Sequence, residues 1–273
     1  MVVEQDGIEQ SVMLRVTDNP LRDGPFDLVL VCVKSMDTVS AVATLAGRLS
    51  SSAIVLSIQN GVENPERIST VISDAQVSGV AIYVGIERVE RLRVIRRPSR
   101  GPSGEVRDRM VGGPPGPIGD VLLAIGTAVD LRVELTDDPT AALWSKLIGN
   151  VCLNTVTALG RSRVGAVFAS PNAAALMLAL GQEVEAVASA AGVSVPPDAT
   201  EAYIADARER LPASGGTSTL FDLEADRPLE HDALIGAVVR IGGRTGVATP
   251  LGRACLTLLD LLDQRNRLAP MGY

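Results

Sequence analysis

The sequence predicts an α/β fold in which a parallel sheet comes first and an all-helical C-terminal domain follows. Three short apolar runs alternate with two helix-like stretches, which gives the order strand, helix, strand, helix, strand over residues 28–33, 37–49, 54–58, 63–72 and 77–83. Continuous apolar runs rich in β-branched residues are typical of parallel strands that helices cover on both faces. The first half is therefore predicted to be a doubly covered parallel sheet.

The second half has the sequence pattern of helices. After a short strand-like stretch at 131–135, Asp137-Asp138-Pro139 is a helix start signal, and the chain is helical in texture from Thr140 onward. We therefore place a domain boundary between 136 and 137. The apolar helix expected at 173–191 is interrupted by Gln182, Glu183 and Glu185, so we expect it to pack between helices or across a dimer and not to cross a membrane.

Residues 86–119 break the pattern, because Arg, Gly and Pro are frequent there and neither strand nor helix periodicity is clear. We interpret this stretch as a long loop or an irregular hairpin. Its basic character is compatible with a phosphate site, but an arginine-rich loop in an acidic protein is more often a solvated surface, so we assign it no role.

Composition and charge exclude several classes of function. The chain has 273 residues, 46 % of them hydrophobic, and a formal net charge of −7, so it can form a core but offers nucleic acid or an anionic membrane no overall positive charge. Cys32, Cys152 and Cys255 lie in apolar segments without Cys-x-x-Cys spacing, which predicts buried reduced thiols, no disulfide and no metal. No signal peptide and no apolar run of about 18 residues is found, so the expected location is cytoplasmic. The one histidine, His231, excludes chemistry built on a histidine pair and leaves acid–base work to Lys, Glu or Asp.

The first candidate site is a polar stripe in an otherwise apolar helix. Lys146, Asn150 and Asn154 are spaced four residues apart, so on an α-helix they share one face. An ammonium and two amides among large apolar side chains need a partner or a ligand. The alternative, a lysine that extends from a helix end into solvent, would be favoured if Lys146 stood alone.

Further polar groups follow the first two predicted strands. Lys34 comes after the first and Gln59-Asn60-Gly61 after the second, and the carboxyl ends of parallel strands meet at the edge of a sheet where ligands bind. Each group also has an interpretation without a ligand. A lysine at the end of a strand is common, and Asn60 is a residue type favoured in turns, where it tolerates positive φ.

Taken together, the motifs occur in one order over most of the chain: Val33-Lys34-Ser35, Gln59-Asn60-Gly61, Trp144-Ser145-Lys146 with Asn150 and Asn154, then Ser218, Asp222 and Glu230-His231-Asp232. This order and spacing resembles the ketopantoate reductase family. The resemblance implies a truncated Rossmann-like parallel sheet in a partial dinucleotide-binding domain, 1–136, and a helical substrate and dimerisation domain, 137–273. It also implies NADPH-dependent reduction of 2-dehydropantoate, or a related small 2-oxo acid, in pantothenate biosynthesis, with a hydride passing from nicotinamide to the C2 carbonyl carbon.

The resemblance also implies roles for individual residues. Lys146 is similar to the family's general acid, and partial desolvation of a lysine lowers its pKa, which independently suits that role. The substrate-binding positions implied are Asn60, Asn150, Asn154 and Ser218, and the cofactor-binding positions are Lys34, Asn60, Gly85 and Glu230.

Two of these candidates have weak cases without the resemblance. Ser218 is also a plausible N-cap or loop hydroxyl, and Glu230 is also a plausible solvated loop acid. The neighbouring His231, in a charged stretch, is expected to be exposed and is left out of the site.

Two departures from the family pattern bear on these expectations. Where the family has a further amide after the second helix asparagine, this chain has Val164, which weakens the case for 2-dehydropantoate itself. The family opens with a strand, a Gly-x-Gly-x-x-Gly turn and a helix that hold the cofactor pyrophosphate. This chain shows no such turn, so we expect the first βαβ unit to be missing, a strand pair at 7–16, and an exposed apolar edge at strand 28–33.

A second hypothesis follows from the second departure. A chain without the glycine-rich turn lacks the helix N-terminus that holds a pyrophosphate. The alternative function is therefore a catalytically impaired or non-catalytic relative that no longer binds the dinucleotide.

Overall fold

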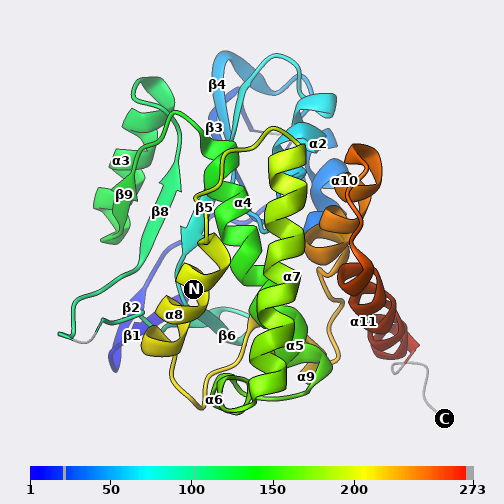
Figure 1. The fold of residues 1–273 in the computed structure, drawn as a ribbon. Coiled ribbons are helices and arrows are strands. Elements are labelled where there is room, and N and C mark those ends of the chain that lie inside the picture. The colour runs from blue at the N-terminus through cyan, green and yellow to red at the C-terminus, as the bar shows by residue number, and fades with distance from the viewer. Residues whose placement is uncertain (21–22, 102, 269–273) are drawn as a thin grey trace. The chain divides into compact units, whose positions relative to one another are not determined.

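A computed structural model describes residues 1–20, 23–101 and 103–268 (Figure 1). The chain forms two compact units, each described by itself below. The sheet unit comprises residues 1–32, 38–58 and 65–139, and the helical unit comprises residues 33–37, 59–64 and the chain from Thr140 onward. A sheet region followed by a helical region confirms the predicted fold class.

The larger sheet contains the three predicted parallel strands. Its order is β3-β4-β5-β8-β9, in which β3, β4 and β5 run parallel, β8 is antiparallel to β5, and β9 is parallel to β8. The strands are β3 Phe26–Val31, β4 Leu49–Ser57, β5 Gln76–Tyr83, β8 Arg109–Gly112 and β9 Arg132–Glu134. The helix predicted at 37–49 is shorter than expected, because α1 ends at Ala43 and Leu49 already pairs with Phe26 in the sheet.

Helices cover both faces of this sheet, as the continuous apolar strands predict. Successive strand residues point to opposite faces. Val55 packs with residues of α1, Thr38–Ala43, and α2, Asn64–Val71, whereas Ile54 and Leu56 pack in the cluster that includes α3, Pro117–Val129. The apolar run of β4 is therefore buried on both sides.

Strand β3 lies at the edge of the sheet, as expected. Among the described residues its sheet partner is β4 alone, and Leu28 and Leu30 are 39 % and 42 % exposed. The expectation that all three cysteines are buried is wrong for Cys32, which directly follows this edge strand and is exposed.

For residues 86–119 the interpretation as an irregular hairpin is confirmed over 86–96, where the pairing has a register shift between Arg88 and Glu90, whereas β8 and the start of α3 are regular elements that were not expected. Strands β6, Ile86–Glu90, and β7, Arg93–Arg96, form a hairpin that joins β1, Val2–Gln5, and β2, Ile8–Ser11, in a second sheet of order β2-β1-β7-β6. Besides the backbone ladders, charged side chains pair across this sheet: Arg93 with Glu4 and Glu9, and Arg97, which follows β7, with Glu87. Such pairs stabilise a sheet without the apolar alternation by which strands are recognised in a sequence. The strand pair expected at 7–16 lies earlier in the chain, because β1 and β2 form a hairpin over residues 2–11 and only β2 falls within the expected range.

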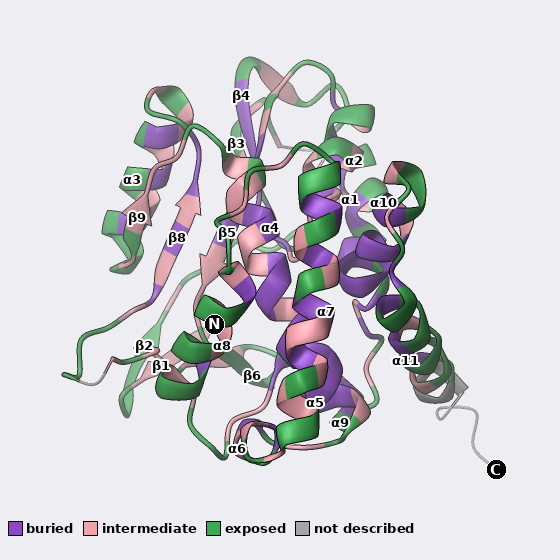
Figure 2. Ribbon diagram, viewed as in Figure 1, coloured by how far each residue is buried: buried purple, intermediate pink, exposed green. Residues whose placement is uncertain are grey.

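The helical unit is built around a long helix, α7, Pro171–Ala190. The other helices are α4 Pro139–Gly149, α5 Thr155–Leu159, α6 Val164–Ala169, α8 Ala199–Arg210, α9 Ser218–Glu224, α10 Ala237–Thr245 and α11 Pro250–Leu268, with π-helical turns η3 Asn150–Asn154 and η4 Asp232–Gly236. Figure 2 shows buried residues along α4, α5 and α7. Gly181 of α7 allows close packing on η3, since a Cβ there would lie 2.7 Å from the Sγ of Cys152.

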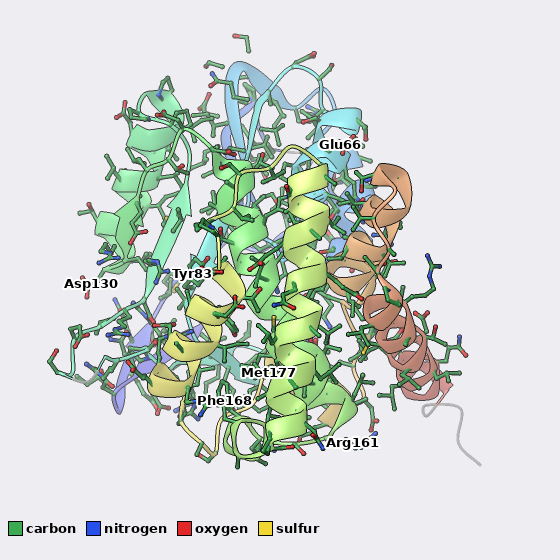
Figure 3. The ribbon with its side chains drawn as sticks, in the orientation of Figure 1. Glu66, Tyr83, Asp130, Arg161, Phe168 and Met177 are labelled. Atoms are coloured by element: carbon green, nitrogen blue, oxygen red, sulfur yellow. The ribbon has the colours of Figure 1, made fainter. Side chains whose placement is uncertain are left out.

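One described helix, α7, has the length and composition of a membrane span, contrary to the expectation that it is too polar. One face of α7 packs in the core of the helical unit, and 33 % of its apolar window is buried. Met177, Leu180 and Val184 are completely or almost completely buried against neighbouring helices of the unit. Figure 3 labels Met177 on this helix. For this face the first of the two alternatives, packing between helices, is confirmed, and packing across a dimer stays a prediction.

Candidate functional site

The predicted polar stripe lies on one continuous helical run formed by α4, η3 and α5. Trp144, Leu147 and Ile148 are buried in the core and fix the orientation of the run. The segment that carries Asn150 and Asn154 is a π-helical turn, which the sequence did not reveal. Single π-helical turns inside α-helices are frequent at functional sites.

Lys146 makes the contact that defines the site. Its Nζ donates a hydrogen bond of 2.9 Å to Oδ1 of Asn60, from the loop that follows β4. Burial lowers the pKa of Lys146 from its ordinary value of 10.5 to about 8, and the negative charge of Glu230 opposes part of that decrease. The alternative of a lysine that extends into solvent does not describe this side chain.

The loop from Gln59 to Asn64 presents Asn60 through its backbone conformation. Gly61 has φ +93°, and a Cβ there would lie 2.6 Å from the carbonyl oxygen of Ala233. The buried Asn64 donates to the carbonyl oxygen of Asn60 at 2.7 Å and to Oγ of Ser35 at 3.0 Å. The turn interpretation is therefore correct for the loop, yet the left-handed residue is Gly61, and the Asn60 side chain remains available for Lys146.

The loop after β3 joins the same site. Lys34 forms an ion pair of 2.8 Å with Asp222 and also donates to the carbonyl oxygen of Pro228. The buried Ser35 donates to Oε1 of Glu230 from its backbone nitrogen at 2.9 Å. Its hydroxyl lies 3.0 Å from the carbonyl oxygen of Asn60 and 3.2 Å from Oε1 of Glu230, and its one hydrogen serves either acceptor. These bonds connect Glu230 to the strand-end loop, so the interpretation of Glu230 as a solvated loop acid is wrong.

Asn154 and Ser218 lie within reach of each other. The nearly buried Asn154 points its Nδ2 at Oγ of Ser218 over 3.5 Å, at the start of α9. The N-cap of α9 is Thr217, whose hydroxyl accepts the N–H of Leu220. The capping role that competed for Ser218 therefore belongs to its neighbour, and Ser218 is exposed.

Three other predicted positions have different outcomes. Asn150 is partly buried between Lys146 and Asn154, and its amide makes no hydrogen bond to another described side chain. Gly85 lies in the sheet unit, in the turn between β5 and β6, where its carbonyl oxygen accepts the N–H of Arg97. Val164 is 1 % exposed in the helical core, where it is an apolar packing residue.

The expectation that His231 is exposed is wrong. The side chain is 6 % exposed, and its Nε2 lies 2.7 Å from Oδ1 of Asp260 on α11. It is buried because the loop before η4 turns it towards α11, a contact between segments that are separate in the sequence.

Sequence reasoning missed three residues of the site. Ser35 and Asp222 stand inside quoted motifs but received no role, and Asn64 carried no signal beyond its place near the start of α2. Each acts through a hydrogen bond to a residue on another segment. Composition and spacing within one segment do not reveal such bonds.

The helical unit thus brings hydrogen-bond donors, among them Ser35 and Lys146, close to the carboxylate of Glu230. The sequence contains just two lysines, Lys34 and Lys146, and both belong to this site. An ammonium with a pKa of about 8, together with amide and hydroxyl groups, suits a small molecule with carbonyl and carboxylate oxygens. Among the described residues no cluster of His, Cys, Asp and Glu is suited to a metal ion.

Comparison with known proteins gives a consistent family. The model described as "Ketopantoate reductase PanE/ApbA" matches residues 2–102, and "Ketopantoate reductase PanE/ApbA C terminal" matches residues 138–263. The 2-dehydropantoate 2-reductase of Halobacterium salinarum is 33 % identical over 97 % of this chain and 84 % of its own length, and that of Pyrobaculum aerophilum is 31 % identical over 89 % and 78 %.

Solved structures agree on the fold. A PanE/ApbA family ketopantoate reductase from Ralstonia eutropha superposes with a TM-score of 0.85 at 31 % identity, covering 98 % of this chain and 86 % of that one. D-mandelate dehydrogenase in a ternary structure with NADH and anilino(oxo)acetate shares the fold with a TM-score of 0.82 at 16 % identity, covering 97 % and 85 %.

The N-terminal match corrects one expectation. The family model for that region aligns from residue 2, within β1, through residue 102. The expected absence of the family's opening module is therefore not supported. The aligned segment includes β1 and β2, which belong with β7 to the second sheet.

Proposed function

Because the chain belongs to the ketopantoate reductase family, we propose that it reduces 2-dehydropantoate, or a related small 2-oxo acid, to the 2-hydroxy acid with NADPH. The observation that carries the proposal is the hydrogen bond from Lys146 to Asn60, made by a lysine whose pKa is lowered to about 8. We place the reaction in pantothenate biosynthesis and in the cytoplasm, in line with the family resemblance of the sequence.

In the proposed reaction Lys146 is the acid. Its ammonium donates a proton to the C2 oxygen as negative charge develops there, and a pKa of about 8 keeps it protonated yet a ready donor near neutral pH. Asn150, Asn154 and Ser218 supply donors for the carboxylate and hydroxyl oxygens of the substrate. Glu230 favours the protonated form of Lys146 by its charge.

The donor set at the loops after β3 and β4 fits the nicotinamide and ribose end of NADPH. The amide of Asn60 keeps its hydrogens for a ligand, because its Oδ1 is the atom bonded to Lys146. Lys34, Asn60, Gly85 and Glu230 are the residues we assign to the cofactor, and NADPH, when bound, supplies the hydride to C2. Lys34 is neutralised by Asp222, so we do not assign it a phosphate.

The direct test is oxidation of NADPH by the purified chain with 2-dehydropantoate. Lys146→Ala is expected to lower kcat by roughly 10²–10⁴, the range that a general acid contributes. The control is Asp206→Ala, which breaks a half-exposed ion pair with Arg210 on α8 and is expected to leave the rate unchanged. Full activity in the Lys146 variant would contradict the role of the lysine.

A non-catalytic relative is the alternative, favoured by the absence of a Gly-x-Gly-x-x-Gly motif in the sequence. Calorimetric titration with NADPH separates the two. Micromolar binding excludes the alternative, whereas no binding up to millimolar NADPH excludes the reductase for this chain.

We further propose a homodimer through the helical unit. The exposed face of α11 carries a stripe of apolar residues at the spacing of a helix-pairing seam: Leu251, Ala254, Leu258 and Leu261. A dimeric ketopantoate reductase is known from Staphylococcus aureus.

Light scattering tests the dimer. Leu258→Glu is expected to give a monomer, and Leu123→Glu, at a similarly exposed leucine of α3 in the sheet unit, is expected to leave the dimer intact. A monomeric parent protein at micromolar concentration would refute this interface.

A further inference from the structure

The short segment that carries Glu230 is attached to α11 on both sides of that residue. The N–H of Leu229 donates to Oδ1 of Asp263 at 2.7 Å, and Nε2 of His231 lies 2.7 Å from Oδ1 of Asp260. Leu229, His231 and Asp263 are each less than a tenth exposed. Two carboxylates one helical turn apart thus hold the neighbours of Glu230.

Glu230 itself extends away from these two attachments. Its Oε1 accepts the backbone N–H of Ser35, and the Ser35 hydroxyl directs its one hydrogen to this oxygen or to the carbonyl oxygen of Asn60; the charge of Glu230 acts on Lys146. Because both neighbours are fixed, the backbone of Glu230 has little freedom to move. The contacts of Leu229 and His231 with α11 therefore help to fix where the Glu230 carboxylate lies relative to Lys146.

The hydrogen bonding of His231 indicates a directed polar contact. Its Nδ1 is buried and has no partner among the described residues, so the neutral ring with hydrogen on Nε2, donating to Asp260, satisfies the geometry. A protonated ring would bury a second N–H without an acceptor. The remaining charges nearby are otherwise engaged, since Asp263 accepts from Leu229 and Asp232 accepts from Arg240.

We propose that His231 is a positioning residue, whose hydrogen bond to Asp260 holds the Glu230 carboxylate on Ser35 and beside the site lysine. It touches neither substrate nor cofactor in this scheme and acts through Glu230. The proposal rests on the proposed function only for the importance of Lys146, because the geometry and its readout exist without substrate.

The two lysines of the sequence make a direct readout available. In protein labelled with ¹³C at lysine Cε, the NMR spectrum contains one signal for Lys34 and one for Lys146, and Lys34→Arg assigns them. A pH titration then gives the pKa of Lys146, about 8 in the parent. The measurement needs no cofactor, so a failed reductase assay and a failed positioning role are distinguishable.

The test compares three variants with the parent. In His231→Ala the pKa of Lys146 is expected to fall, because Glu230, which raises it, is no longer held in place. His231→Gln, which keeps an N–H within reach of Asp260, is expected to restore the parental value. Asp206→Asn removes a carboxylate from α8, remote from this contact, and is expected to change nothing.

An unchanged Lys146 pKa in a folded His231→Ala protein overturns the proposal. If that variant does not fold, Asp260→Ser removes the same hydrogen bond from a half-exposed position and is judged by the same criterion. A fall in the pKa that His231→Gln does not restore also overturns it, because the effect would then come from packing and not from the hydrogen bond.

Discussion

Replacing Lys146 with methionine is expected to make the protein more stable while removing the acid from the site. The pKa decrease from 10.5 to about 8 means that folding disfavours the ammonium relative to the amine by roughly 3 kcal/mol. Methionine has a similar length and no charge to desolvate. Loss of the hydrogen bond from the charged ammonium to Asn60 offsets about 1.5–3 kcal/mol, so we expect a net gain of at most about 1.5 kcal/mol at pH 7.

The lowered pKa of Lys146 also predicts how the free energy of unfolding changes with pH. Between about pH 8 and 10.5 the unfolded state binds more protons at Lys146 than the folded state, so stability rises with pH in this window. The penalty is complete below about pH 8 and is lost towards pH 10.5. The advantage of Lys146→Met over the parent is therefore expected at pH 7 and should be much smaller at pH 10.

Urea unfolding of parent and variant at both pH values measures these free energies. Lys34→Met is the matched control, because that lysine is ion-paired with Asp222 and its loss should destabilise the protein. The reasoning is refuted if Lys146→Met is less stable than the parent at pH 7. It is equally refuted if the difference is the same at pH 10.

The remaining predictions concern how the site is supported, and urea unfolding measures each of them. Gly61→Ala is expected to destabilise the protein by about 2–4 kcal/mol, because φ is +93° and a Cβ would lie 2.6 Å from the Ala233 oxygen; a neutral result would show that the loop shifts freely. Thr217→Ala should cost about 1 kcal/mol through loss of the α9 N-cap, and Thr217→Ser should recover most of it. Leu147→Ala should cost about 2–5 kcal/mol by leaving a cavity in the helical core, and a cost below about 1 kcal/mol would contradict its burial.

Much of the architecture was predictable because it depends on periodicity. The apolar runs around Val31, Val55 and Val80 predicted parallel strands, and all three residues are buried in the sheet unit. The stretch 86–119 was not predictable in the same way. Its strands β6 and β7 pair with β1, far away in the sequence, and carry charged pairs in place of an apolar alternation; Arg93 and Glu4, for example, lie 89 positions apart.

For the site, too, local spacing was predictable from the sequence and contacts between distant segments were not. The four-residue spacing of Lys146, Asn150 and Asn154 was enough to indicate a shared helix face. The hydrogen bonds that complete the site were not predictable from local sequence, because their partners are far apart along the chain. Asn60 lies 86 positions from Lys146, and Glu230 lies 195 positions from Ser35. The burial of His231 against Asp260 was also not predictable from a charged local sequence.

The sequence alone determined the fold class, the family resemblance and the residue types available for chemistry, because these depend on local spacing and composition. The tertiary structure determined which of those residues meet, that Ser35 and Asn64 connect the two loops, and that burial lowers the pKa of Lys146 to about 8. The physical reason is that hydrogen bonding and desolvation depend on distances between segments, which packing sets and which no local pattern encodes.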